Sequence, residues 1–438
     1  MPMEYIELCQ KASELRKKGL YADALACYEE LTFGFAGLCT SWDYWGHAYC
    51  LLKLGKWREA ETFCRSYREK EEPFQPIDNV LAWSLYYQYI KGAEADDTKL
   101  LTGYAEEVLA LCRKEDKYSP YTATVFQVLE ALSRKFPYPA ETILQWAEQL
   151  DAGLLDENTV EVNRPDGKKM ELASRREQYY MILTRALYEC ARYEECAEKC
   201  DQALTSLTAF HYDNDVWFRR RKALCLFYMG NATEAIELMR GVFARKKDWF
   251  VRFELGEMLI NTGKKDEGAS LLASAALERG DPEKKLKLYA ALARWFDNNG
   301  KHETAMAHYT LIWQLRVAQG WKEDEEIRSR LENEQVDLST IPSADNLIQK
   351  LFPQWEELAN SNREKMQGVI QKLLPNGKAG FIVTVDGKTY YFELRNFKGR
   401  REEASPGCRV KFFLEDGYDA RKQRSVKNAV QVMPEKNC

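Results

Sequence analysis

The residues best suited to chemistry lie near the C-terminal end, where aromatic and basic side chains alternate with apolar ones. Phe381 and Tyr391 each sit in a short β-type run. Exposed aromatic rings on a strand can stack on the bases of a single-stranded nucleic acid, at roughly 1–3 kcal/mol per base. Neighbouring basic side chains then contact phosphates, which makes such binding salt-dependent. The basic residues that we expect in this role are Lys372, Lys378, Arg395, Arg421 and Arg424.

Five β-type runs within residues 366–432 must position these side chains. Turn signals separate the runs, such as Pro375-Asn-Gly377 and Asp386-Gly387. Short strands punctuated in this way are typical of a small five-stranded barrel. The predicted strands are Met366–Gln371, Gly380–Val385, Thr389–Leu394, Arg409–Leu414 and Val426–Val432.

These runs resemble the cold-shock domain, a variant of the OB-fold. The matching segments, in order, are Gly368–Ile370, Gly377–Ile382, Tyr390–Leu394, Pro406–Phe412 and Lys427–Val430. The resemblance implies a barrel that binds single-stranded RNA or DNA, with Phe381 and Tyr391 at two of the stacking positions. This sequence departs from the pattern in three places: Ala379 replaces an aromatic residue, Glu393 replaces a histidine, and Lys372 lies near the position of an expected tryptophan. The alternative is a barrel that has been adapted for protein contacts.

A second pattern repeats along the rest of the chain. A glycine is followed two residues later by an aromatic or polar residue, and three residues after that by a small residue. Gly55, Trp57 and Ala60 illustrate this spacing, and an amphipathic segment precedes each copy. Glycine at the end of one helix and a small residue in the next are typical of a helical hairpin. The copies begin near residues 5, 41, 177, 216, 249 and 286.

This pattern resembles the tetratricopeptide repeat (TPR), a helix–turn–helix unit that stacks into an α-solenoid. The resemblance implies a peptide- or protein-binding groove lined by the first helix of each unit. Alternatively, neighbouring segments of the same chain fill the groove. The predicted groove is aromatic, and its residues are Trp42, Trp45, Tyr49, Trp217, Arg220, Phe227, Tyr228, Phe250 and Phe253.

The two patterns together predict a mainly α chain with three regions. Residues 1–320 form the TPR-like solenoid, with less regular helical pairs at 78–113 and 121–150. A β-hairpin at 157–173 interrupts the solenoid, because alternating apolar residues flank a Pro-Asp-Gly turn. Residues 321–362 are an acidic capping helix and a linker, and residues 363–434 form the small all-β barrel of the OB or cold-shock type.

The charge distribution separates the barrel from the body. The chain has 438 residues and a net charge of -5. Residues 363–438 hold 16 basic and 9 acidic residues, a net of +7, so the remainder carries -12. This asymmetry favours different partners for the two parts. No apolar run reaches the roughly 20 residues of a membrane helix. With no secretion signal, the twelve cysteines predict a reducing, cytoplasmic location.

The chain offers little for catalysis or for binding a metal or cofactor. Cys190, Cys196, Cys200 and His211 form the strongest metal-like cluster, but Cys196 and Cys200 fall at core positions of a repeat. Buried cysteine commonly packs as a small apolar residue. We find no phosphate-binding loop, zinc-protease motif or nucleophile elbow. We therefore expect a protein that is not an enzyme and that holds no cofactor.

The sequence as a whole predicts an adaptor. Its barrel would bind single-stranded nucleic acid, more readily RNA than DNA, while its solenoid would bind a protein partner. The architecture is typical of a bacterial accessory protein. Two alternatives remain: a scaffold that binds only proteins, with the barrel as an assembly element, and an accessory subunit of an enzyme on another chain.

Overall fold

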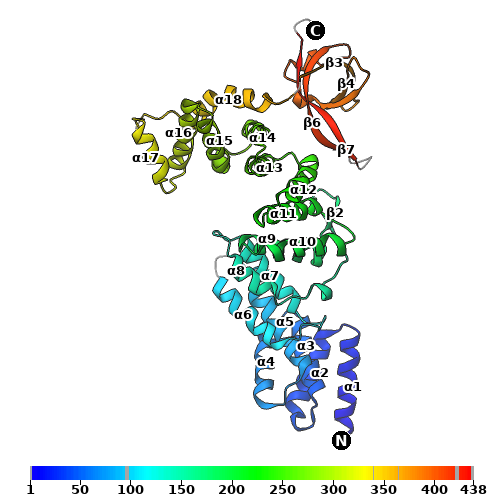
Figure 1. Ribbon diagram of the computed structural model, residues 1–438. Coiled ribbons are helices and arrows are strands. Elements are labelled where there is room, and N and C mark those ends of the chain that lie inside the picture. The colour runs from blue at the N-terminus through cyan, green and yellow to red at the C-terminus, as the bar shows by residue number, and fades with distance from the viewer. Residues whose placement is uncertain (1, 94–97, 339, 364, 420–423, 436–438) are drawn as a thin grey trace. The chain divides into compact units, whose positions relative to one another are not determined.

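The computed structural model describes residues 2–93, 98–338, 340–363, 365–419 and 424–435. The chain divides into two compact units, Met1–Asn214 and Asp215–Cys438. The first unit is helical apart from one hairpin, and the second contains helices followed by a barrel (Figure 1). The prediction of an α-solenoid followed by a small all-β barrel is therefore confirmed.

The first unit consists of helical hairpins and one β-hairpin. Strands β1 (Val160–Asn163) and β2 (Lys169–Leu172) pair antiparallel where the sequence predicts a hairpin. Two of the predicted repeats in this unit pair α1 with α2 and α3 with α4, and the third pairs α9 with α10. The helices are α1 Met3–Lys17, α2 Tyr21–Gly34, α3 Ser41–Lys53, α4 Trp57–Lys70, α5 Gln75–Leu85, α6 Thr98–Leu111, α7 Tyr121–Ser133, α8 Ala140–Ala147, α9 Arg175–Glu189 and α10 Tyr193–Ser206.

The second unit continues the repeats and ends in the barrel. Its three predicted repeats correspond to α11 with α12, α13 with α14, and α15 with α16. The helices are α11 Asn214–Tyr228, α12 Ala232–Arg245, α13 Trp249–Asn261, α14 Lys265–Leu277, α15 Leu286–Asn298, α16 His302–Ala318, α17 Glu325–Asn333 and α18 Ala344–Asn360.

The turns inside the hairpins explain the repeated glycine. Gly55 has a φ of 73°, and its N–H donates to Leu52 O while the next N–H, of Lys56, donates to Leu51 O. This pattern is the Schellman motif, which needs a residue in the left-handed region. The repeat that lacks glycine has Ala191 at the same position, with a φ of 56° and the same pair of bonds. The turn geometry therefore holds even where the sequence signal is missing.

The small residue in each second helix allows two backbones to approach. Ala24, Ala60, Ala235 and Ala305 have no exposed surface. At Gly268, a Cβ atom would lie 2.5 Å from the carbonyl oxygen of Gly256 on the preceding helix. Such a distance leaves no room for a methyl group, so glycine is required at this crossing.

Helix α18 lies in the stretch that the sequence assigns to a linker. Its Trp355 is buried and donates from Nε1 to Nε2 of His308, on α16, at 2.8 Å. His308 is also buried, and its Nδ1 lies 2.7 Å from the carbonyl oxygen of Thr304. Burial lowers the pKa of His308 to about 4, so the ring is neutral. Helix α18 is thus part of the helical core. The predicted boundaries at residues 320 and 362 stay predictions.

The barrel closes in the order β3-β4-β5-β7-β6. All neighbouring strands are antiparallel except β5 and β7, which are parallel. Ile370, Ile382, Phe392 and Phe412 fill the interior. Each predicted strand is present, although β6 and β7 are longer than expected. The strands are β3 Lys365–Leu373, β4 Ala379–Val383, β5 Thr389–Glu393, β6 Arg409–Asp419 and β7 Arg424–Pro434.

Candidate nucleic-acid interface

The outer face of strands β3, β4 and β5 brings three predicted site residues into one row. Along β4 and β5, Ile382 and Phe392 point into the barrel, so the adjacent Phe381 and Tyr391 must point outward. Phe381 pairs with Lys372 on one side and with Tyr391 on the other. The two rings meet edge to face at 5.8 Å, and Nζ of Lys372 lies 5.6 Å from the Phe381 ring. This row, Lys372–Phe381–Tyr391, is called the platform below.

The two aromatic rings of the platform are half-buried, so part of each remains accessible. The edge-to-face contact fixes their orientation at little further cost in side-chain entropy. The ammonium group of Lys372 lies close enough to a ring to serve a phosphate beside a stacked base. The arrangement therefore combines an apolar stacking surface with a cation.

A cavity of about 750 Å³ adjoins the platform. One wall is the turn from Asn376 to Lys378, the second is Tyr391 and Glu393 at the end of β5, and the third is the connection through Arg401. The guanidinium of Arg401 donates to the carbonyl oxygen of Gly377 at 3.1 Å and so holds two walls together. The cavity is large enough for a nucleotide, and it shares Tyr391 with the platform.

The two departures from the cold-shock pattern face each other at this cavity. Ala379 and Glu393 are cross-strand partners on β4 and β5, directly beside the Phe381–Tyr391 pair. Both line the cavity, together with Lys378 and Arg395. The carboxylate of Glu393 forms an ion pair with Nε of Arg395. Ala379 is only 3% exposed, and Glu393 places a carboxylate on the wall of the cavity.

The remaining predicted phosphate-binding residues lie elsewhere. Arg424 is exposed at the start of β7, four residues before Asn428, the partner of Tyr391. Four residues of strand correspond to roughly 13 Å, so the structure does not bring Arg424 to the platform. Arg421 falls outside the described residues. The structure therefore groups Lys372, Lys378 and Arg395 around the platform and cavity.

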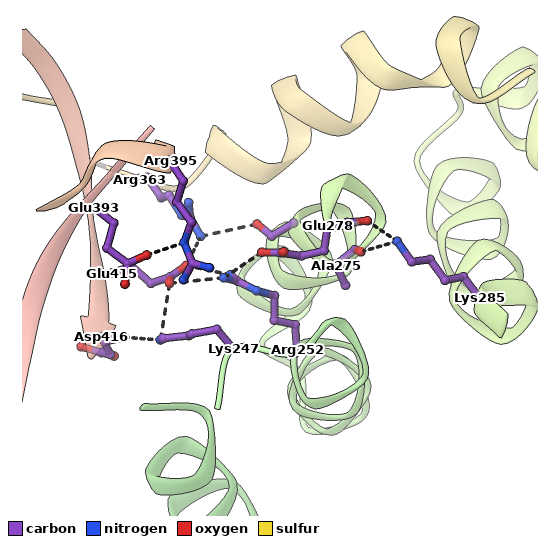
Figure 2. A network of polar contacts seen from close by, with 11 residues as sticks. Lys247, Arg252, Ala275, Glu278, Lys285, Arg363, Glu393, Arg395, Glu415 and Asp416 are labelled. Carbon is purple, nitrogen blue, oxygen red and sulfur yellow. Dashed lines mark hydrogen bonds and ion pairs between the residues drawn. The ribbon is translucent and has the colours of Figure 1, made fainter. Parts of the chain in front are cut away.

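An ion cluster connects strand β6 of the barrel to the helices of the second unit. Glu415 of β6 is surrounded by three cations that come from other elements (Figure 2). Its carboxylate lies 2.7 Å from Arg252 of α13, 3.4 Å from Lys247 and 3.4 Å from Arg363. Lys247 also donates to the carbonyl oxygen of Asp416, and Arg252 pairs with Glu278 at 3.3 Å. We call Glu415 and its three cations the anchor cluster.

The electrostatics of the anchor cluster follow from its burial. The side chains of Arg252 and Glu415 are 8% and 10% exposed. Burial alone raises the pKa of the Glu415 carboxyl, but the charges of Arg252, Lys247 and Arg363 outweigh it and hold that pKa at about 2. Burial lowers the pKa of Lys247 to about 8, although Glu415 opposes this change. The carboxylate is therefore ionised at neutral pH and balances cations that are removed from water.

The anchor cluster also decides which barrel face remains accessible. In the closed order β3-β4-β5-β7-β6, strand β6 borders β3 and β7 and is not a neighbour of β4 or β5. The helices contact the barrel through β6, and Asn360 at the end of α18 contacts Gln431 of β7 at 2.9 Å. Phe381 and Tyr391 of the platform lie on β4 and β5, whereas Lys372 lies on β3, which borders β6.

The predicted groove residues of the first unit form a continuous aromatic row. The ring of Trp45 lies 5.5 Å from Trp42 and 5.1 Å from Tyr49. Phe74 extends the row beyond Trp42 at 5.0 Å. The guanidinium of Arg16 lies 4.6 Å from the Trp45 ring, which adds a cation that sequence reasoning missed. Trp42 is 59% exposed, so the row reaches the surface.

The predicted groove residues of the second unit are less continuous. Trp217 lies 6.0 Å from Phe250, and Arg220 covers the Phe250 ring at 5.0 Å. Arg220 is also paired with Glu254, with Nε 2.7 Å from Oε2. Phe227 and Tyr228 contact each other at 6.1 Å. Phe253 instead packs against the helical core.

Two of the three cysteines in the strongest metal-like cluster, Cys196 and Cys200, are core residues. Cys196 and Cys200 have no exposed surface, and Sγ of Cys196 contacts the carbonyl oxygen of Thr184 at 3.1 Å. His211 binds a different partner, with Nδ1 2.7 Å from the buried carboxylate of Glu177. Among the described residues, no three His, Cys, Asp or Glu side chains are grouped to hold a metal ion. In the same part of the chain, no helix is long and apolar enough to cross a bilayer.

Sequence reasoning missed the anchor cluster and most of the cavity wall. The charges of Glu415 and Asp416 follow an apolar run and indicate the end of a strand, whereas β6 continues to Asp419. Arg252 and Lys247 lie more than 160 residues before Glu415. A signal for the cavity was present in the sequence, because Ala379 and Glu393 depart from the cold-shock pattern together.

Comparisons with known proteins show limited similarity. A family model described as a domain of unknown function (DUF7017) matches residues 216–351, which lie in the second unit. No curated protein matches the chain. Among solved structures, a thermophilic TPR protein, TTC0263 from Thermus thermophilus, is 14% identical, with a TM-score of 0.21, over 58% of this chain and 99% of that one.

Two further solved structures cover more of this chain. The human IFIT1 dimer with m7Gppp-AAAA is 13% identical, with a TM-score of 0.34, over 80% of this chain and 87% of that one. The Cut9–Hcn1 complex of the APC/C is 10% identical, with a TM-score of 0.35, over 80% of this chain and 74% of that one. These values are too low to transfer a binding activity to this chain.

Proposed function

We propose that the protein is a non-enzymatic adaptor whose barrel binds single-stranded nucleic acid, RNA in preference to DNA, and whose helical repeats bind a protein partner. The observation that carries the proposal is the Lys372–Phe381–Tyr391 platform. Its strands are the second and third of the barrel, and that face binds oligonucleotides in OB-type barrels. The strand order supports an OB-type barrel of the cold-shock kind. Lys378 and Arg395 supply positive charge beside the platform, and Lys378 contacts a phosphate.

The helical repeats supply the second half of the adaptor. The aromatic row around Trp45 offers an apolar surface for an extended or helical peptide. Connecting two binding modules raises the effective concentration of one ligand near the other without any new contact. The protein would in this way hold an effector protein close to a bound RNA strand.

A titration of the full chain tests the nucleic-acid part. Fluorescence anisotropy would follow labelled RNA and DNA of roughly 12 nucleotides, a length within the range bound by such barrels, at low and high salt. We expect saturable binding that weakens with salt and is tighter for RNA. Phe381→Ala with Tyr391→Ala should weaken it at least roughly tenfold, since each stacked base contributes about 1–3 kcal/mol.

Tyr418→Ala is the matched control, because Tyr418 is an exposed aromatic residue of the same barrel on β6. It should leave the affinity unchanged. An absence of binding to either strand at low salt would refute the nucleic-acid part. Equal losses in the platform and control variants would show that the platform is not the binding surface.

A protein scaffold in which the barrel serves assembly is the second candidate function. The anchor cluster favours it, because the cluster gives the barrel a structural connection to the helices. This candidate predicts no oligonucleotide binding. It also predicts a partner that copurifies with the wild type and is lost in Trp42→Ala/Trp45→Ala. An enzyme retained in that way would identify the chain as an accessory subunit.

A further inference from the structure

We infer that the cavity beside the platform is a specificity pocket for a guanine base of the bound strand. The inference rests on the proposed function and adds a base preference to it. It is carried by the cavity, by the absent side chain at Ala379 and by the Glu393–Arg395 ion pair. The platform by itself would stack any base, because every base has a π-face.

Ala379 forms part of the cavity lining. Residues 379 and 381 lie on the same face of β4, two positions apart, and the small side chain of Ala379 is only 3% exposed at the base of the cavity. The Tyr391 ring forms the adjoining wall. A ring at position 379 would occupy this space. The cavity thus allows one base to leave the stacked row and to present its edge to Glu393.

The chemistry of the wall selects among the bases. A carboxylate only accepts hydrogen bonds. The Watson–Crick edge of guanine has two neighbouring donors, N1–H and N2–H₂, which match the two oxygens of a carboxylate. Cytosine and adenine each place an acceptor next to their amino group, and uracil places its N–H between two carbonyl oxygens. Glu393 therefore attracts the edge of guanine and repels part of the edge of each other base.

Arg395 completes the match. Its Nε pairs with Glu393, so a guanidinium lies directly beside the carboxylate. The third group on the guanine edge is the O6 acceptor, next to N1–H, and an arginine donates to such an oxygen. Lys378, exposed on the opposite wall, remains for the phosphate of the same nucleotide. The pocket thus places an acceptor and a donor in the order that the guanine edge requires.

The test is a titration of the full chain with four RNA probes. Each is an oligouridine of roughly 12 nucleotides, with its central position occupied by uridine, guanosine, adenosine or inosine. We expect the guanosine probe to bind roughly tenfold more tightly than the all-uridine probe, the usual scale for one bidentate base contact. Inosine lacks the N2 amino group and should bind with intermediate affinity. Adenosine should give no gain.

Two variants isolate the pocket from the platform. Glu393→Gln replaces one acceptor with a donor and should abolish the guanosine preference, so that the guanosine and all-uridine probes bind this variant with equal affinity. Ala379→Phe places a ring in the cavity and should also abolish the preference. Glu402→Gln is the control, because this exposed carboxylate lies on the same connection but outside the cavity. Circular dichroism verifies that each variant is folded.

The outcomes separate the inference from the proposed function. Equal affinity for the guanosine and all-uridine probes, or a preference that persists in Glu393→Gln, overturns the guanine pocket while the proposed function stands. A gain for adenosine equal to that for guanosine also overturns it. If no probe binds at low salt, both the proposed function and the pocket are refuted.

Discussion

Substitution of Glu415 by glutamine tests the role of the anchor cluster. The change removes the negative charge and keeps the size of the side chain. Three cations then remain, namely Arg252, Lys247 and Arg363. The carboxylate of Glu278, 3.3 Å from Arg252, still pairs with that arginine. Since the side chain of Arg252 is only 8% exposed, its charge has little access to water. We expect a marked loss of stability in the second unit.

Two independent figures give the size of this loss. Removing one partner of a buried ion pair costs about 3–5 kcal/mol, because the remaining charge stays desolvated. The pKa of Glu415 is about 2 in place of 4.5, and at roughly 1.4 kcal/mol per pKa unit this difference corresponds to about 3 kcal/mol. Because the folded chain binds the proton more weakly, this stability is present above pH 4.5 and is lost as the pH falls towards 2.

Hydrogen exchange of the full chain measures the effect without assuming that the units unfold together. Where exchange in the wild type occurs by opening of this interface, a loss of about 3 kcal/mol should accelerate exchange in β6 and α13 by roughly a hundredfold at neutral pH. Glu402→Gln removes an exposed charge from the same barrel and should change nothing. The double variant Arg252→Gln/Glu415→Gln should be less destabilised than the sum of its single variants. Wild-type exchange rates in Glu415→Gln would refute the reasoning.

Two substitutions and one pH dependence test the helical repeats by urea denaturation. Ala191→Gly should raise the free energy of unfolding by about 0.5–1 kcal/mol, because alanine is strained at its φ of 56°. Gly268→Ala should lower it by about 1–3 kcal/mol, because the new Cβ would lie 2.5 Å from a backbone oxygen. His308 should make stability fall by roughly 3 kcal/mol between about pH 6.5 and 4, because the unfolded chain takes up a proton that the folded ring, with a pKa of about 4, does not.

Matched controls accompany these substitutions. Ala318→Gly lies in an ordinary helical turn and should destabilise, opposite in sign to Ala191→Gly. At Gly241, on an exposed helical face, an added Cβ meets nothing within 4 Å, so Gly241→Ala should stabilise. His308→Asn should reduce the pH dependence, while the part that comes from His47, whose pKa burial also lowers to about 4, should remain. The Ala191 prediction fails if Ala191→Gly and Ala318→Gly change stability in the same direction. The Gly268 prediction fails if Gly241→Ala also destabilises. The His308 prediction fails if His308→Asn leaves the pH profile of stability unaltered.

Local sequence patterns were sufficient to predict the elements of the fold. The spacing of Gly55, Trp57 and Ala60 indicates a helical hairpin because a left-handed turn and a close helix crossing each depend on residues a few positions apart. Alternation around Phe381 and Tyr391 likewise indicates which side chains point out of the barrel. Lys372 was expected near them from the resemblance to the cold-shock pattern, and its contact with the Phe381 ring depends on the pairing of β3 with β4.

Helix α18 and the full length of β6 were harder to predict. The sequence from 338 to 362 is polar enough to be taken for a linker, but Leu347, Leu351 and Trp355 of its helix pack into the helical core. The charge of Glu415 indicates exposure, but its side chain is only 10% exposed because it pairs with cations from distant helices. In both cases a partner that is remote in sequence reverses the local preference.

The sequence by itself determined the helical hairpins, the five strands, the turns between them and the residues of the platform, because each depends on backbone preferences and periodicity within a few residues. The tertiary structure decided what lies beside the platform and which barrel face is covered. The cavity forms only where a turn, two strands and a connection lie side by side. The anchor cluster forms only where Lys247, Arg252 and Arg363 all contact Glu415. Such convergence depends on packing over long sequence separations, which no local pattern records.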